Sequence, residues 1–157
     1  MLLLLLAAQA TTPATHFWGR FSRAPVLAHR QETVEIASDG SDGGTLRYKL
    51  RLTRTRLGKV EEVLWASSLT CPAVRPLLES LPALPVPSIR PFGVGAPQDL
   101  EIVLDGTGYA LHMPVMFGRQ MGEVDLTSNV GTPLAAWVDG ALTRLAPCWS
   151  AVELRAR

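Results

Sequence analysis

The chain has 157 residues, 47% of them hydrophobic, with 15 Lys and Arg against 14 Asp and Glu. This length fits one domain whose core is large enough to fold without a structural metal. The near balance of charge argues against a nucleic-acid-binding protein, which would carry a strongly basic domain.

The N-terminus begins with a short apolar run, Leu2 to Ala8, that ends in Ala8-Gln9-Ala10. Small residues after such a run are typical of a cleaved signal peptide, so we expect residues 1–10 to be removed and the protein to be periplasmic or secreted. A hydrophobic strand or a membrane anchor is the alternative, although a bilayer span needs about 20 apolar residues. No transmembrane segment is expected after signal removal. The run has no basic residue before it, which leaves open a start upstream of Met1.

The chain has two cysteines, Cys71 and Cys148, which allow one intramolecular pairing. Export to an oxidising compartment favours a disulfide between them, which in the chain-entropy model adds roughly 4 kcal/mol of stability. Neither cysteine has a second Cys or a His at ligand spacing, so we expect no metal and no cofactor.

Residues 11–30 have no clear period, and we interpret them as an extended N-terminal arm before a single domain over residues 31–157. The segment from His16 to Phe21 holds three aromatic residues. We expect these to pack on the domain, with an exposed patch that grips a partner as the alternative.

Alternating apolar residues predict a hairpin of residues 33–36 and 46–52 around a Gly-rich turn. Its second strand places Arg47, Lys49 and Arg51 on one face, which we expect to be in solvent. Residues 59–67 fit a third strand or a short helix.

A short helix is predicted next, because Val74, Leu77, Leu78 and Leu81 share one stripe. Thr70 is its expected N-cap, and Pro82 limits its end. A proline-rich connection follows.

The second half opens on a predicted hairpin of residues 100–104 and 109–113, with Leu104 opposite Tyr109. This register puts Glu101 opposite His112. We place Pro114 at an edge or bulge and a further strand over residues 122–127.

The last element is a helix with Thr132 as N-cap and Pro133 in the first turn, ended by Pro147. The predicted fold is therefore α+β: an antiparallel sheet of two hairpin or meander units, with two amphipathic helices packed on one face and a disulfide.

No nucleophile elbow, zinc-protease motif or phosphate loop is found in the sequence. His112 and Glu101 are weak catalytic candidates, because a carboxylate can tune an imidazole near neutral pH. Arg47, Lys49 and Arg51 are weak ligand-binding candidates for an anionic envelope component or an acidic protein surface. A surface ion pair and a solvated sheet face are the simpler interpretations.

The leading hypothesis is an exported, disulfide-stapled, non-enzymatic protein of the bacterial envelope that binds or shields an unknown ligand. The alternative is a small periplasmic hydrolase-like enzyme with a site near His112.

Overall fold

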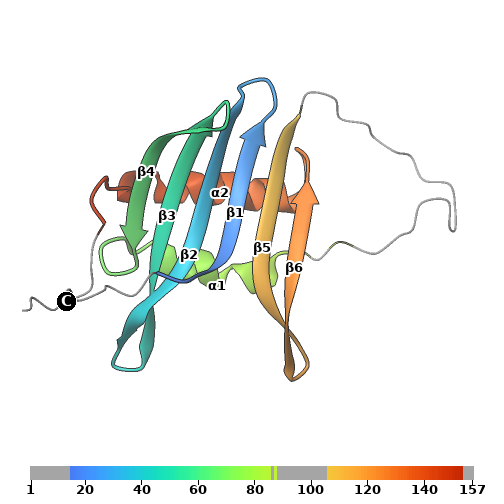
Figure 1. Ribbon diagram of the computed structural model, residues 1–157. Coiled ribbons are helices and arrows are strands. Elements are labelled where there is room, and N and C mark those ends of the chain that lie inside the picture. The colour runs from blue at the N-terminus through green and yellow to red at the C-terminus, as the bar shows by residue number, and fades with distance from the viewer. Residues whose placement is uncertain (1–14, 86, 88–105, 154–157) are drawn as a thin grey trace, which may run out of the picture.

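The computed structural model describes residues 15–85, 87 and 106–153. In these parts of the chain one six-stranded antiparallel sheet has the strand order β4-β3-β2-β1-β5-β6 and is accompanied by two α-helices (Figure 1). The predicted α+β class and antiparallel sheet are confirmed. The predicted signal peptide over residues 1–10 lies outside the described residues.

Four consecutive strands form a meander. They are β1 (Phe17–Pro25), β2 (Arg30–Asp42), β3 (Thr45–Arg56) and β4 (Lys59–Ser67). The predicted hairpin is the β2–β3 pair, in which Val34 lies opposite Leu52 and Ile36 opposite Leu50. All four side chains are buried, which explains why the period of two was visible in the sequence. Of the two structures considered for residues 59–67, the strand is correct.

Strand β1 is an internal strand between β2 and β5, so the predicted arm over residues 11–30 is wrong where the structure describes it. Phe21 lies opposite Val34 on one side and Leu111 on the other, and it is fully buried. The inward positions of β1 are Gly19, Phe21 and Arg23, which is not a regular apolar series. A Cβ at Gly19 would lie 2.6 Å from Sδ of Met113, so a larger residue there would require the methionine side chain to move.

Strands β5 (Thr107–Phe117) and β6 (Gln120–Ser128) form the second hairpin, which confirms a strand over residues 122–127. Strand β5 also pairs with β1 as far as His112. Beyond that point β5 continues beside β6, which accommodates Pro114, a residue without an N–H, as predicted for an edge.

The predicted strand over residues 100–104 lies outside the described residues. Both neighbours of β5 are nevertheless assigned, because His112 lies opposite Arg20 on β1 and Asp125 on β6. A strand has two ladder neighbours, so the predicted pairing of Glu101 with His112 is wrong.

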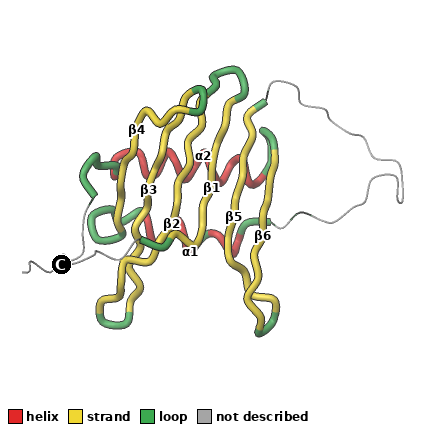
Figure 2. The backbone as a smooth tube through the Cα atoms, viewed as in Figure 1, coloured by secondary structure: helices red, strands yellow, loops and turns green. Residues whose placement is uncertain are grey.

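The helices are α1 (Val74–Glu79) and α2 (Pro133–Leu145), each followed by a 3₁₀ turn, η1 (Leu81–Ala83) and η2 (Ala146–Cys148). Figures 1 and 2 show both helices behind the sheet, and their buried side chains join those of the inner sheet face in one core. We call this face the inner face. The core includes Phe21, Ile36, Leu50, Leu52, Val74, Leu77, Leu111, Val138 and Leu145.

Helix α2 begins as predicted, because Thr132 Oγ1 accepts a hydrogen bond from the Ala135 amide at 3.1 Å. Helix α1 does not. Its N-cap is Ala73 instead of Thr70, and no side chain caps it. The short α1 contains Pro76, which supplies no N–H to the helix.

The predicted disulfide joins Cys71 to Cys148, with Cα atoms 5.5 Å apart. The segment after η2 then returns along the sheet edge, where Ser150 and Trp65 exchange backbone hydrogen bonds of 2.8 and 2.9 Å. The end of α2 is therefore fixed both to the turn before α1 and to β4.

Candidate ligand-binding groove

A groove of about 620 Å³ lies on the inner face, between α1 with η1 on one side and the β5–β6 hairpin on the other. Its lining is contributed by β1, β3, β5, β6, α1 and η1. The residues are Trp18, Tyr48, Leu78, Glu79, Leu81, Pro82, Leu84, Leu111, Met113, Pro114, Val115, Phe117, Val124 and Leu126.

The chemistry of this lining is almost entirely hydrocarbon. The rings of Trp18 and Tyr48 meet edge to face, with centroids 6.4 Å apart. Among the described residues that line it, Glu79 is the one with a charged side chain; it is exposed and lies 3.9 Å from Arg75 of the same helix. The described lining of the groove therefore offers apolar surface along its length, with the Glu79 carboxylate at its border.

The groove exists because the sheet is longer than its helical cover. Strands β5 and β6 keep their apolar alternation beyond the last residue that pairs with β1, while α1 spans only Val74–Glu79. Phe117 folds across β6, where a Cβ at Gly122 would lie 2.7 Å from its Cε2. The inward side chains of this hairpin, such as Met113 and Val124, thus form a wall of the groove.

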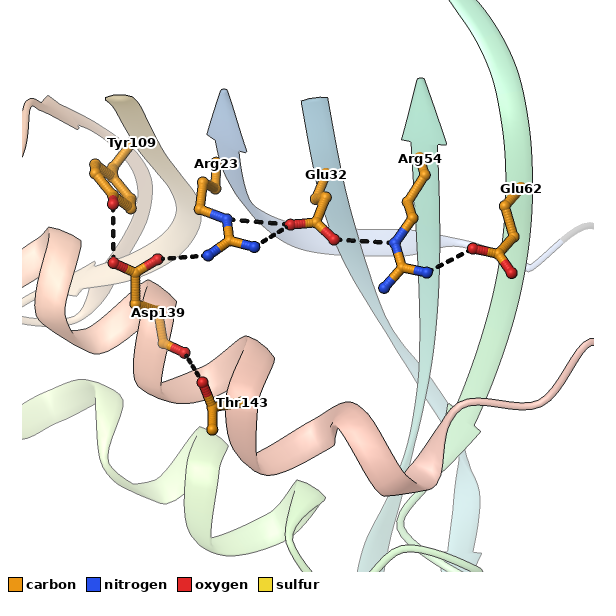
Figure 3. Close-up of polar contacts among 7 residues, drawn as sticks. All are labelled: Arg23, Glu32, Arg54, Glu62, Tyr109, Asp139 and Thr143. Carbon is orange, nitrogen blue, oxygen red and sulfur yellow. Dashed lines mark hydrogen bonds and ion pairs between the residues drawn. The ribbon is translucent and has the colours of Figure 1, made fainter. Parts of the chain in front are cut away.

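A polar row borders the core at the other end of the inner face (Figure 3). Tyr109, Arg23, Glu32, Arg54 and Glu62 occupy consecutive ladder positions across five strands. Glu32 accepts hydrogen bonds from Arg23 and from Arg54, whose Nε lies 2.9 Å away. Arg54 also donates to Glu62 at 2.5 Å.

Asp139 attaches this row to α2. It accepts hydrogen bonds from the Tyr109 hydroxyl at 2.8 Å and from Arg23 Nη1 at 3.0 Å. Burial and the bond to Asp139 raise the pKa of Tyr109 above its ordinary value. Burial alone would raise the pKa of Glu32, but the hydrogen bonds from Arg23 and Arg54 outweigh it, so its pKa lies below the ordinary value.

A charged cleft of about 490 Å³ adjoins this row. Its charged lining consists of Arg23, Arg30, Arg54, Glu32, Glu61 and Glu62. Every one of these side chains is in an ion pair, including the pair of Arg30 and Glu61 at 3.6 Å. Internal pairing satisfies these charges, and the cleft is a weaker candidate for a ligand than the groove.

The basic residues predicted to face solvent on β3 differ from one another. Lys49 is buried, between Asp39 at 3.6 Å and Glu153 at 3.2 Å, so the predicted exposure is wrong for this residue. Arg51 pairs with Glu35 at 2.6 Å and stacks on the Phe17 ring. Arg47 is half-buried and donates to the Asp39 carbonyl. These acids come from β2 and from the segment after α2, so their proximity was not visible in the local sequence.

His112 points away from the groove, because it alternates with the inward Leu111 and Met113. Its Nδ1 lies 2.8 Å from Oδ1 of Asp125, a carboxylate that takes the place expected for Glu101. Neither the groove nor the charged cleft is lined by His112. Among the described residues, no Ser, Thr or Tyr hydroxyl is hydrogen-bonded to His112.

The sequence did not identify the groove. Its signal is the apolar alternation of residues 109–117 and 122–126, which by itself does not distinguish a covered sheet face from one that lines a groove. In the part of the chain that is described, no group of three or more His, Cys, Asp and Glu side chains could hold a metal ion. None of the helices described there has the length and apolar character needed to cross a membrane.

Comparisons with protein-family models, with curated proteins and with solved structures each found no match to this chain.

Proposed function

We propose that this protein is an exported binding protein that holds a small, predominantly apolar molecule, such as one with an acyl chain, in the inner-face groove. The observation that carries the proposal is the groove of about 620 Å³ with its nearly all-hydrocarbon lining. Small-molecule sites in proteins are typically concave, apolar and of about 300–1,000 Å³.

The energetics favour an apolar occupant. Removing apolar surface from water contributes about 25 cal/mol per Å², for the ligand and the groove alike. A strongly charged ligand would lose its hydration beside Leu81, Met113 and Leu126 without gaining a partner. Glu79 at the border favours a ligand whose polar end is neutral or cationic.

Export is the second part of the proposal. It is supported by the apolar run before Ala8-Gln9-Ala10 and is compatible with the disulfide between Cys71 and Cys148. The intact mass of the protein recovered from its own cells tests it. A product that begins near Thr11 supports export, and a product that retains Met1 contradicts it.

Ligand binding is tested with N-phenyl-1-naphthylamine, an uncharged dye whose fluorescence rises in apolar sites, followed by displacement with dodecylamine. We expect saturable binding to the oxidised protein. Val124→Trp should reduce it at least about tenfold, because the indole would fill space beside Met113.

Val63→Trp is the matched control, since Val63 is an exposed strand residue on β4 that does not line the groove. It should bind the dye as the parent does. Equal binding by the Val124→Trp and Val63→Trp proteins would overturn the proposal.

A further inference from the structure

Two turns lie side by side at the end of the sheet opposite the β5–β6 turn (Figure 1). They are the β1–β2 loop, Val26–His29, and the β3–β4 turn, Leu57–Gly58. The Leu57 amide donates a hydrogen bond of 2.9 Å to the His29 carbonyl, so the two turns form one surface. We call this surface the loop end.

Four aliphatic side chains are exposed here, three on the loop end and the fourth, Val60, at the start of β4. The exposed fractions are 57% for Val26, 74% for Leu27, 72% for Leu57 and 61% for Val60. Single exposed aliphatic residues are ordinary, but a group on two adjoining turns indicates a contact surface.

The backbone at this place is also unusual. His29 has φ of 48° and Leu57 has φ of 50°, values in the left-handed region that residues other than Gly, Asn, Asp and His seldom adopt, so Leu57 is the unusual residue. Leu at such a position is unfavourable for the fold by itself. The presence of an exposed Leu at this turn is understandable if its side chain binds something outside the molecule.

The charge around these aliphatic residues is basic. Arg30, Arg56 and Lys59 flank the turns, together with His29. The acids that follow the two turns, Glu32, Glu61 and Glu62, are each paired with an arginine. Within the described residues, neither Arg56 nor Lys59 takes part in an ion pair, unlike Lys49 and Arg51 on the same hairpin.

We propose that the loop end docks on a lipid bilayer that contains anionic phospholipid, with the aliphatic side chains in the interface and Arg56 and Lys59 on the phosphates. Aliphatic tips within a basic rim match such a bilayer in both apolar character and charge. An acidic protein partner is less well matched, because protein interfaces are enriched in aromatic residues and Met, which these turns lack. This surface is separate from the groove and does not depend on its ligand.

The test is co-sedimentation of the oxidised protein with vesicles of phosphatidylcholine alone or mixed with phosphatidylglycerol. We expect binding to the mixed vesicles that weakens as salt rises. Arg56→Gln with Lys59→Gln should weaken it about tenfold or more, since each basic residue near an anionic surface contributes to binding.

A second variant, Leu27→Ser with Leu57→Asn, tests the aliphatic contribution. Asn tolerates a positive φ, so the turn at residue 57 keeps its conformation. This variant should also lose about tenfold or more in vesicle binding while it binds the naphthylamine dye as the parent does.

The matched control is Met116→Ser with Met121→Ser, a cross-strand pair of exposed apolar residues near the opposite end of the sheet. It should leave vesicle binding unchanged. The proposal is overturned by three results: no sedimentation with the mixed vesicles, an equal loss in the methionine control, or binding that survives the Leu27 and Leu57 substitutions. The last result would indicate a purely electrostatic surface, such as one for an acidic protein.

Discussion

Arg23 connects the sheet to helix α2, because its Nη1 lies 3.0 Å from Oδ1 of Asp139 while the same guanidinium binds Glu32 on the neighbouring strand. Asp139 also accepts a hydrogen bond from the Tyr109 hydroxyl. One helix residue is therefore tied to two adjacent strands, β1 and β5. The polar row therefore connects helix α2 to the sheet at this end of the core.

The Arg23–Asp139 contact should be energetically significant. In a double-mutant cycle of Arg23→Met and Asp139→Asn, we expect a coupling of about 1 kcal/mol or more from urea unfolding, because the pair is half-buried and hydrogen-bonded. The cycle of Arg30→Gln and Glu61→Gln is the control. That pair is 3.6 Å apart with side chains 62% and 40% exposed, and it should couple by less than about 0.5 kcal/mol. Equal coupling energies in the two cycles would contradict a role of Arg23 and Asp139 in holding α2 on the sheet.

Acid sensitivity should depend on Glu32. Its pKa is lower in the folded protein than in the unfolded chain, so its contribution to the unfolding free energy is complete above the unfolded pKa of about 4.3 and is lost as pH falls through the lower folded pKa. Glu32→Gln should reduce stability at neutral pH and flatten the fall in stability below about pH 5. The exposed Glu123 provides the control, and Glu123→Gln should leave the fall of the unfolding free energy below about pH 5 as in the parent. If the unfolding free energy of Glu32→Gln falls with acid as steeply as that of the parent, Glu32 does not determine the acid sensitivity.

Reduction of the disulfide should destabilise the protein by about 2–4 kcal/mol, because Cys71 and Cys148 are 77 positions apart and their link restricts the unfolded chain. Guanidinium unfolding with and without dithiothreitol measures the difference. The Cys71→Ser, Cys148→Ser protein should match the reduced parent and should not respond to dithiothreitol. A loss below about 0.5 kcal/mol would show that native-state strain cancels the entropic gain.

Opposite faces of β5 should respond differently to truncation. Leu111 is 5% exposed between Phe21 and Leu126, so Leu111→Ala should cost about 2–5 kcal/mol through lost burial and the cavity left behind. His112→Ala, next along the strand, removes a partly exposed pair with Asp125 and should cost less than about 1 kcal/mol. Urea unfolding of both variants measures the two losses of unfolding free energy. Similar losses would contradict the assignment of Leu111 and His112 to opposite faces.

Lys49 should behave unlike the other basic residues of β3. Its side chain is 9% exposed between two carboxylates, so Lys49→Gln leaves Asp39 poorly compensated and should cost about 1–3 kcal/mol. The exposed Arg56 supplies the comparison, since Arg56→Gln should stay within about 0.5 kcal/mol of the parent in the same unfolding assay. If Lys49→Gln leaves the unfolding free energy unchanged, Asp39 and Glu153 are well solvated without the lysine.

Features set by neighbouring residues were predictable from the sequence. The β2–β3 hairpin, the Thr132 cap and the strand over residues 122–127 each follow from a local pattern, and the disulfide follows from there being only two cysteines. Features set by distant pairing were not. The sequence could not show that β1 separates β2 from β5, or that Glu153 reaches Lys49. The groove belongs to this second kind, because it depends on how far α1 extends over strands that come later in the chain.

The placement of β1 also determines the order in which the sheet can assemble. Strands β1 to β4 are joined by short turns, so the meander needs only local contacts, whereas the β1–β5 pairing joins Phe21 to Leu111 across most of the chain. Contacts between residues far apart in sequence form slowly, because the loop entropy is lost first. We therefore expect the meander to form early. At that stage β1, an internal strand of the complete sheet, is still an unpaired edge strand. During that interval Phe21 and its neighbours are the segment most prone to pair with another chain.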